Sequence, residues 1–195
     1  MQLLYTKRSP YARKAQIIAL EKNIELNLID EDLANKSPQL LAANPLAKIP
    51  VLILDNGETL FDSPVICEYL DNLKDEPLFI PATHRWKVLR WQALADGLMD
   101  SVVAIYLEKV RHPNDFNVRY LENQEKNCVL VLDYCQQHLN ELAELSLASV
   151  SVACALGYMD FRGLAIHRAE RYAQLIAWYL EFSKRASMQA TIPSN

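Results

Sequence analysis

Glycine is scarce in this chain, and its scarcity excludes two common kinds of site. The 195 residues include only four glycines. No pair of them has the spacing of G-x-G-x-x-G or G-x-x-x-x-G-K-[ST], the two glycine-rich loops that bind nucleotide phosphates. The sequence therefore predicts that the protein uses neither an NAD-type nor an ATP-type cofactor.

The chain also lacks a basic surplus and a long apolar run. Its 20 Lys and Arg against 24 Asp and Glu give a net charge of −4, whereas nucleic-acid-binding proteins usually carry an excess of basic residues. The longest stretch without a charged residue, 145–159, has 15 residues, which is too short to cross a bilayer. We therefore expect neither nucleic acid nor a membrane as a partner.

Cysteine and histidine are few and scattered. The four cysteines form no C-x-x-C pair, and the four histidines have no spacing typical of metal ligands, so the sequence predicts no metal site. The first residues, MQLLYTKRSP, contain no apolar segment of the kind found in signal peptides. We expect a cytoplasmic protein whose cysteines are buried, reduced thiols.

The first 75 residues alternate between strand-like and helix-like patterns. Asp55-Asn56-Gly57 between two apolar runs is a strong signal for a β-hairpin. The apolar periodicities predict a β-α-β-α-β-β-α order, in which a small mixed sheet carries helices on its faces. The expected strands are 2–6, 25–29, 51–54 and 58–61, and the expected helices are 12–22, 33–43 and 66–73.

The rest of the chain shows only helical periods. We expect helices over about 84–111, 115–142, 147–160 and 165–187, the last divided into two. Prolines and charges over 77–83 are typical of a linker. The sequence therefore predicts an α/β domain over 1–76 and an all-α helical bundle domain over 84–195.

Ser9-Pro10 lies where the first strand gives way to the first helix. As structure, serine is a favoured N-cap and proline is favoured at the first helical position. As chemistry, a helix N-terminus favours an anion such as a thiolate, and a serine hydroxyl there can donate a hydrogen bond to it. The motif by itself is consistent with both interpretations.

Two further proline motifs allow both a structural and a functional interpretation. Pro50 opens a strand, and a cis Ile49–Pro50 bond would leave the main chain of Ile49 free to pair with an extended peptide. In Asp62-Ser63-Pro64 we expect Ser63 to cap the third helix. The same pair suits an α-amino acid head group, because Asp62 can bind the ammonium and Ser63 the carboxylate.

The three motifs occur in the order and spacing of the cytosolic, bacterial-type glutathione S-transferases, which this chain resembles over nearly its whole length. The resemblance implies a thioredoxin-like first domain followed by a helical domain. It also implies an N-terminal capping box on the helix after Ser146. That family usually has Asp where this chain has Ser149, so we expect a cap weaker by about 1 kcal/mol.

The resemblance assigns roles in glutathione binding. Ile49 would pair through its main chain with the cysteinyl part of glutathione, beside a cis Pro50. Asp62 and Ser63 would hold the γ-glutamyl end, although the family more often has Glu before that serine. Lys48 would contact the glycyl carboxylate.

The resemblance further assigns Ser9 as the hydroxyl that activates the thiol of glutathione, with Thr6 as the second candidate. Glutaredoxins, which share the first domain's fold, carry C-P-Y-C where this chain has Ser9-Pro10-Tyr11-Ala12. Both redox cysteines are missing, so the mechanism that remains is stabilisation of a bound thiolate.

Other side chains are candidates for supporting roles. Arg13 lies among basic residues near the same junction and is a candidate for drawing an anionic tripeptide toward the site. Met99, Tyr106 and Tyr158 are candidates for lining an apolar pocket for the second substrate, although most apolar helix residues belong to the core.

The resemblance implies a homodimeric glutathione transferase that joins the thiolate of glutathione to a small electrophile, without a metal or a nucleotide. Two alternatives stay open. One is a non-catalytic regulatory protein of the same fold, like the stringent-starvation proteins. The other is a glutathione-dependent isomerase or dehalogenase. The presence of Ile49-Pro50 and Asp62-Ser63 favours binding of glutathione.

Overall fold

The chain divides by its internal contacts into two compact units. The computed structural model describes residues 1–168 and 170–194. Unit 1 comprises Met1–Arg85 and Arg185–Asn195, and unit 2 comprises Trp86–Lys184. The sequence pattern assigned everything from 84 to 195 to the helical domain, whereas the contacts group the segment from 185 onward with unit 1.

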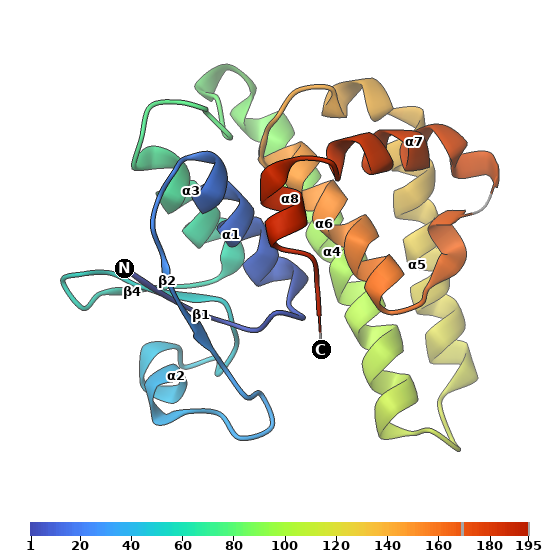
Figure 1. Ribbon diagram of the computed structural model, residues 1–195. Helices are drawn as coiled ribbons and strands as arrows, with labels where there is room; N and C mark the ends of the chain where they lie inside the picture. Colours follow the sequence, from blue (N-terminus) through green and yellow to red (C-terminus); the bar gives the residue numbers. More distant parts are fainter. Residues whose placement is uncertain (169, 195) are drawn as a thin grey trace. The chain divides into compact units, whose positions relative to one another are not determined.

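Unit 1 contains a four-stranded mixed sheet in the order β2-β1-β3-β4 (Figure 1). Strand β1 is parallel to β2 and antiparallel to β3, and β3 and β4 form the predicted hairpin. Gly57 has a φ of 88° in the hairpin turn, a conformation that glycine adopts without steric cost. The strands are β1 (Gln2–Tyr5), β2 (Asn27–Asp30), β3 (Val51–Ile53) and β4 (Thr59–Leu60).

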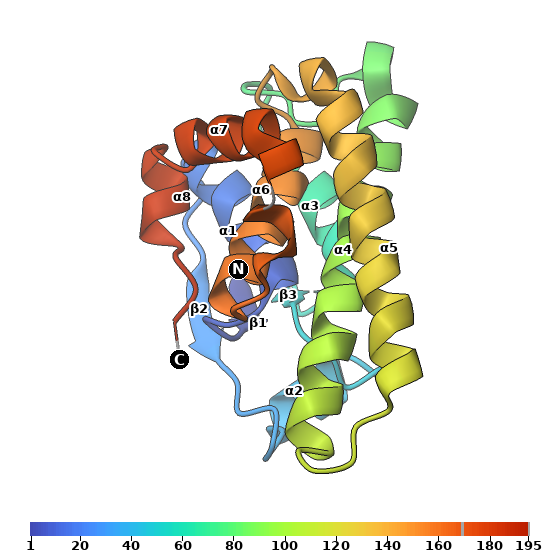
Figure 2. The ribbon, with the colours of Figure 1, turned by 90° about the vertical axis from the view of Figure 1, so that its right-hand side faces the viewer.

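Helices cover both faces of this sheet. Helices α1 (Pro10–Glu21) and α3 (Ser63–Asn72) lie side by side on one face, and α2 (Pro38–Ala43) lies on the other (Figures 1 and 2). Under α2, Leu40 packs with Leu4 and Val51 in a fully buried cluster. The element order β-α-β-α-β-β-α confirms the predicted thioredoxin-like unit.

The predicted helix over 33–43 is wrong in its first half, because α2 begins only at Pro38. The carboxylate of Asp32 accepts hydrogen bonds from the Ala34 amide and the Asn35 side chain, both at 2.9 Å. These bonds hold the segment in a turn, as aspartate side chains commonly do. Ser37 then caps α2 by accepting the Leu40 amide at 3.0 Å.

The C-terminal segment is attached to helix α1. Short helix α8 (Ala186–Ala190) follows Arg185, whose guanidinium donates two hydrogen bonds to Glu21 at 2.9 and 2.8 Å. The hydrogen bond from Arg185 holds the pKa of the Glu21 carboxyl below its usual value. Arg13 also donates to the carbonyl of Met188 at 3.0 Å. These contacts bring the end of the chain to the sheet-bearing unit.

Unit 2 contains helices joined by loops, and no strand, in its described residues, as the sequence predicted. Aromatic side chains join α4 to α5, since the rings of Trp91 and Tyr134 lie 5.3 Å apart. The helices are α4 (Arg85–Arg111), α5 (Val118–Gln137), α6 (Leu147–Phe161) and α7 (Ala173–Phe182), with 3-10 turns at Leu139–Leu142, Ala165–Arg168 and Glu170–Tyr172. A further 3-10 turn, Ala82–His84, precedes them in unit 1.

Helix α6 is the buried centre of unit 2, and every residue from Leu147 to Met159 is buried. Its capping box is complete despite the serine at the third position. Ser149 accepts the Ser146 amide at 2.9 Å, and Ser146 accepts the Ser149 amide at 3.4 Å. Two serine hydroxyl groups therefore accept the amides at the start of α6, where the family usually uses an aspartate for one of them.

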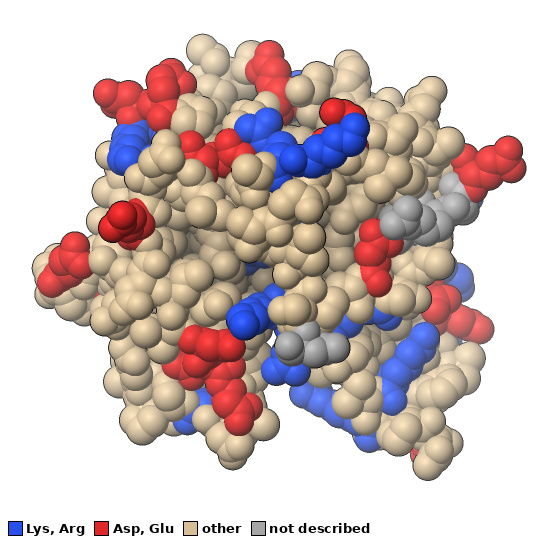
Figure 3. Space-filling model, in the orientation of Figure 1, with Lys and Arg blue, Asp and Glu red and all other residues tan. Residues whose placement is uncertain are grey.

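The surface carries both signs of charge. On the face seen in Figure 3, basic and acidic side chains are interspersed with uncharged surface. Within the described ranges, 1–168 and 170–194, none of the helices combines the length and the apolar character needed to cross a membrane.

The four cysteines are buried and reduced, as expected. Burial raises the pKa of Cys128 to about 11 and that of Cys135 to about 12, so these sulfurs are protonated at neutral pH.

Because the thiolate is the reactive form, we predict negligible reaction of the native protein with a chromogenic aromatic disulfide near neutral pH. In urea, four thiols per chain should react. Fast labelling of the native chain would contradict the buried placement.

Candidate active site

The sheet register brings the three proline motifs to one edge of unit 1. Leu4 of β1 pairs with Val51 of β3, and Leu52 of β3 pairs with Leu60 of β4. Since both pairs are antiparallel, the segments after β1, before β3 and after β4 emerge at the same edge of the sheet. Residues 6–9, 48–50 and 62–63 lie on these segments.

Ser9 caps helix α1. Its hydroxyl oxygen accepts the amide of Ala12 at 3.2 Å, and Pro10 is the first helical residue. Because the oxygen acts as the acceptor in this bond, the hydroxyl proton remains able to donate to another group. The positive end of the helix dipole lies at the same place and favours a negative charge. Ser9 therefore caps α1, as the structural interpretation requires, and keeps a hydroxyl proton at the helix N-terminus, as the chemical interpretation requires.

The segment before β3 has the predicted form. The Ile49–Pro50 peptide bond is cis, Pro50 is buried and Ile49 is half-buried. The main-chain N–H and C=O of Ile49 make no hydrogen bond within the described residues. The side chain of Lys48 is exposed, and its carbonyl accepts a hydrogen bond from the Asn44 side chain at 2.8 Å. An extended peptide can pair with the main chain of Ile49.

The start of α3 differs from the prediction in one respect. The N-cap is Asp62, whose carboxylate accepts the Ser63 amide, and Ser63 is the first helical residue. The carboxylate of Asp62 satisfies the amide of the first helical residue, so Ser63 lies inside the helix and does not cap it. The hydroxyl of Ser63 is therefore left without a protein partner in the described part of the chain, although the residue is only 1% exposed. A buried hydroxyl without a partner is unusual and marks a place for a ligand atom.

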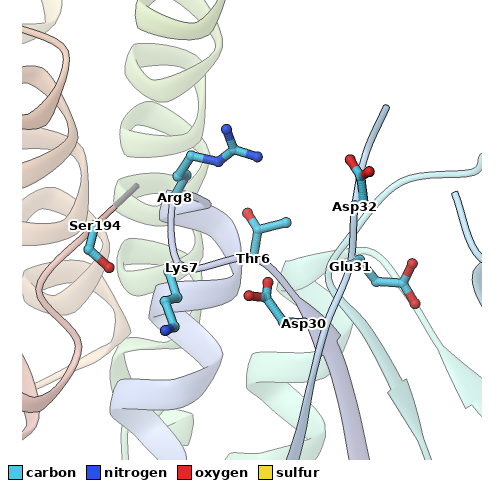
Figure 4. Close-up of a pocket in the computed structure, with 7 residues that line it drawn as sticks. All are labelled: Thr6, Lys7, Arg8, Asp30, Glu31, Asp32 and Ser194. Carbon is cyan, nitrogen blue, oxygen red and sulfur yellow. The ribbon is translucent and has the colours of Figure 1, made fainter. Parts of the chain in front are cut away.

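A polar pocket of about 420 Å³ lies beside these segments in unit 1 (Figure 4). One side is formed by the loop after β1 and the other by the segment after β2, with a residue of the C-terminal segment also in the lining. The lining residues are Thr6, Lys7, Arg8, Asp30, Glu31, Asp32 and Ser194. Of these, Thr6 was expected at the site, and Lys7 and Arg8 belong to the basic residues noted near Arg13 in the sequence. The three consecutive acidic residues were missed, although they are visible in the sequence.

The loop from Thr6 to Ser9 links this pocket to the cap of α1. The Ser9 amide donates to the Thr6 carbonyl at 3.0 Å, which closes a tight turn. Arg8 is the immediate neighbour of Ser9 and lines the pocket. A ligand atom held at the Ser9 hydroxyl therefore lies next to the pocket.

Arg13 does not take the role expected for it. It is 5% exposed, and its guanidinium donates to Thr191 at 3.2 Å and to the Met188 carbonyl. A cation enclosed by the C-terminal segment does not present its charge to an anion in solvent, so the contacts make Arg13 an anchor for that segment.

Of the three candidates for an apolar pocket in unit 2, Met99 and Tyr158 belong to its interior and Tyr106 is half-buried. Met99 is fully buried and Tyr158 is 3% exposed. The guanidinium of Arg162 lies 3.7 Å from the ring centroid of Tyr106 and donates to the Tyr158 hydroxyl at 3.0 Å. The helical spacing of these residues therefore reflects packing, and neither cavity described here is lined by them.

A second cavity, of about 350 Å³, lies wholly within unit 2 between α4 and α5. It is lined by Arg90, Trp91, Leu94 and Tyr134.

Among residues 1–168 and 170–194, His, Cys, Asp and Glu side chains form no group of three or more able to hold a metal ion.

Comparison with known proteins gives the family. Residues 8–73 match the family model for the glutathione S-transferase N-terminal domain. Over 171 residues the chain is 33% identical to the uncharacterized GST-like protein YibF of Escherichia coli (strain K12), and the match covers 85% of each chain. The chain belongs to the glutathione S-transferase family.

Solved structures agree with this assignment. A glutathione transferase family member from Pseudomonas fluorescens Pf-5 with bound glutathione has a TM-score of 0.92 and 37% identity, covering 100% of this chain and 99% of that chain. A structure from the same organism with bound S-(propanoic acid)-glutathione has a TM-score of 0.90 and 37% identity, covering 100% of both chains. The fold predicted from the sequence is thus confirmed.

Proposed function

We propose that the protein is a glutathione transferase that binds glutathione in unit 1 and joins its thiolate to a small electrophile. The main support for this proposal is the buried Ser63 hydroxyl, which has no partner in the described part of the chain. It lies at the same edge of the sheet as Ser9 and Ile49. The relatives from Pseudomonas fluorescens hold glutathione and a glutathione conjugate, which supports the same ligand here.

The peptide would lie along the sheet edge. The main chain of Ile49 pairs with the cysteinyl residue, and the Ser63 hydroxyl donates to the γ-glutamyl carboxylate at the start of α3. Asp62 is exposed and binds the γ-glutamyl ammonium. Lys48, also exposed, contacts the glycyl carboxylate. These contacts leave the sulfur to point toward the cap of α1.

The chemistry is stabilisation of a thiolate followed by attack. A free thiol has a pKa of about 8.5 and is mostly protonated at neutral pH. The Ser9 hydroxyl donates to the sulfur anion and the α1 dipole favours its charge, which together lower the pKa of the bound thiol to about 7. The thiolate then forms a bond to the electrophilic carbon, the leaving group departs with its electron pair, and the thiol proton passes to solvent.

The direct test is calorimetry with glutathione, followed by conjugation assays on a panel of electrophiles. We expect binding at millimolar glutathione or below and conjugation faster than in buffer. No heat of binding at millimolar glutathione would overturn the proposal and favour a non-catalytic regulatory protein of this fold. Binding with isomerisation or dehalogenation, but no stable conjugate, would assign the isomerase or dehalogenase alternative.

Ser63→Ala should weaken glutathione binding about tenfold or more, because a hydrogen bond to a charged group contributes about 1.5–3 kcal/mol. The matched control is Ser151→Ala in α6. Ser151 is fully buried and its hydroxyl is likewise without a partner among the described residues, but it lies in unit 2. Calorimetry on both variants separates ligand contact from the general effect of removing a buried hydroxyl. If both variants bind glutathione as tightly as the parent protein, Ser63 does not contact glutathione.

The proposal includes a homodimer in the cytoplasm, as in the family that the sequence resembles. Sedimentation at micromolar concentration should give a mass near twice 22.3 kDa. A mass near that of a single chain would contradict the dimer without affecting the binding proposal.

A further inference from the structure

The polar pocket in unit 1 is lined by charged side chains, three of which form no ion pair in the described part of the chain. Lys7, Arg8 and Asp30 are exposed, and none of them has an ion-pair partner or side-chain hydrogen bond in the described part of the chain. In Figure 4 the Asp30 carboxylate points toward the segment of Thr6 and Lys7, and the Arg8 guanidinium extends above Thr6. These two cations and one anion line a cavity of about 420 Å³ together with the carboxylates of Glu31 and Asp32, and the charge of Arg8 also acts on Asp32.

The other two carboxylates of the lining are occupied by their own loop. Glu31 accepts the Ser37 hydroxyl at 2.7 Å and points away from Thr6 (Figure 4). Hydrogen bonds from Asn35 and from the Ala34 amide hold the pKa of Asp32 below its usual value. The acidic side chain left for a ligand is therefore Asp30.

Thr6 is a second and independent sign of a ligand. It lines the pocket and is only 4% exposed, yet its hydroxyl makes no hydrogen bond within the described residues. Buried hydroxyl groups normally have a partner. In Figure 4 the Thr6 hydroxyl points to the side on which the Arg8 guanidinium extends, where a ligand atom can supply the missing bond.

We propose that this pocket binds an amino-acid zwitterion, and that the electrophile conjugated by the protein carries one. The carboxylate contacts Arg8 and the Thr6 hydroxyl, and the ammonium contacts Asp30. The inference rests on the proposed glutathione transferase function, since the sulfur at Ser9 is what places the electrophile beside Arg8. It assigns a polar, doubly charged class of second substrate to this member of the family.

The test uses four S-substituted glutathiones that share the tripeptide and differ only on sulfur. The substituents are propyl, carboxyethyl, aminoethyl and amino-carboxyethyl, which are neutral, anionic, cationic and zwitterionic. By calorimetry with the full chain, the zwitterionic ligand should bind about tenfold more tightly than the propyl ligand, because each exposed charge pair contributes a severalfold gain. The two singly charged ligands should fall between them.

Variants of the pocket residues identify which protein charge contributes to the affinity for each ligand. Asp30→Asn should remove the advantage of the zwitterionic over the carboxyethyl ligand, and Arg8→Gln should weaken both of these but leave the propyl ligand unchanged. Glu25→Gln is the matched control for Asp30, since Glu25 is exposed in the same unit and does not line the pocket. It should leave all four affinities unchanged.

The outcomes distinguish a failure of the pocket proposal from a failure of the transferase proposal. If unmodified glutathione and the propyl ligand bind but all four substituents bind alike, the pocket proposal fails and the transferase proposal stands. A carboxyethyl ligand that binds most tightly, with no effect of Asp30→Asn, also overturns the zwitterion. If neither glutathione nor any conjugate binds, both proposals fall together.

Discussion

Asp71→Ala should destabilise the protein by about 3–5 kcal/mol, a large share of the roughly 5–15 kcal/mol that stabilises a typical domain. Asp71 is 3% exposed and forms an ion pair at 3.1 Å with Lys22, whose side chain is fully buried. It also accepts the amides of Phe79 and Ile80 at 2.9 and 2.7 Å. Removing one carboxylate leaves a buried cation without its counter-ion and two buried amides without an acceptor.

Urea unfolding measures this loss as a lower midpoint at unchanged slope. Asp71→Asn should fall between the parent and Asp71→Ala, because the amide keeps one acceptor oxygen. The control is Asp55→Ala, since Asp55 is highly exposed and pairs only with the N-terminus at 2.7 Å, and surface pairs contribute about 1 kcal/mol or less. An Asp71→Ala effect no larger than that of the control would mean that Lys22 is satisfied by other groups, such as the Lys74 carbonyl at 2.6 Å.

Ser9→Ala should lower kcat of glutathione conjugation by about tenfold to a hundredfold and change the affinity for glutathione by less than about threefold. A hydrogen bond to a charged group contributes about 1.5–3 kcal/mol, and each 1.4 kcal/mol corresponds to a factor of about ten in rate. The bond to the sulfur exists only when the sulfur carries charge, so its loss appears in turnover. The tripeptide contacts at Ile49 and Ser63 are unchanged.

Ser9→Thr is the rescue variant, because threonine keeps both the hydroxyl and a favourable N-cap. It should recover most of the turnover that Ser9→Ala loses. Ser9→Ala also removes the hydrogen bond from the Ala12 amide, at a cost of about 1 kcal/mol, so kcat is compared well below the unfolding temperature. A Thr6→Ala variant with the larger loss of turnover would instead assign activation of the thiol to Thr6.

Local signals in the sequence were enough to predict the elements that carry the site. Ser9-Pro10 marked the start of α1, Ile49-Pro50 marked the entry to β3, and Asn56-Gly57 marked the hairpin. In each case the residues that determine the structure are neighbours in the chain. The start of α2 was missed because the hydrogen bonds of Asp32 compete with a helical turn, which hydrophobic periodicity does not register.

The errors in the site arose from contacts between distant residues. Arg13 was expected at the surface, but the segment around Met188 covers it from the other end of the chain. Likewise, the pairing of Lys22 with Asp71 and the approach of Ser194 to Thr6 join residues far apart in sequence. Such contacts depend on the assembled fold, so neither composition nor spacing reveals them.

The most direct test of the account is the ionisation of glutathione bound to the protein. The ultraviolet absorbance of the thiolate, followed as a difference spectrum between mixed and separate solutions, reports the charged sulfur as pH is varied. The account predicts a bound thiol whose pKa has moved from about 8.5 to about 7, and a return toward 8.5 in Ser9→Ala. A saturable complex whose thiol titrates near 8.5 in the parent protein would contradict thiolate stabilisation at Ser9.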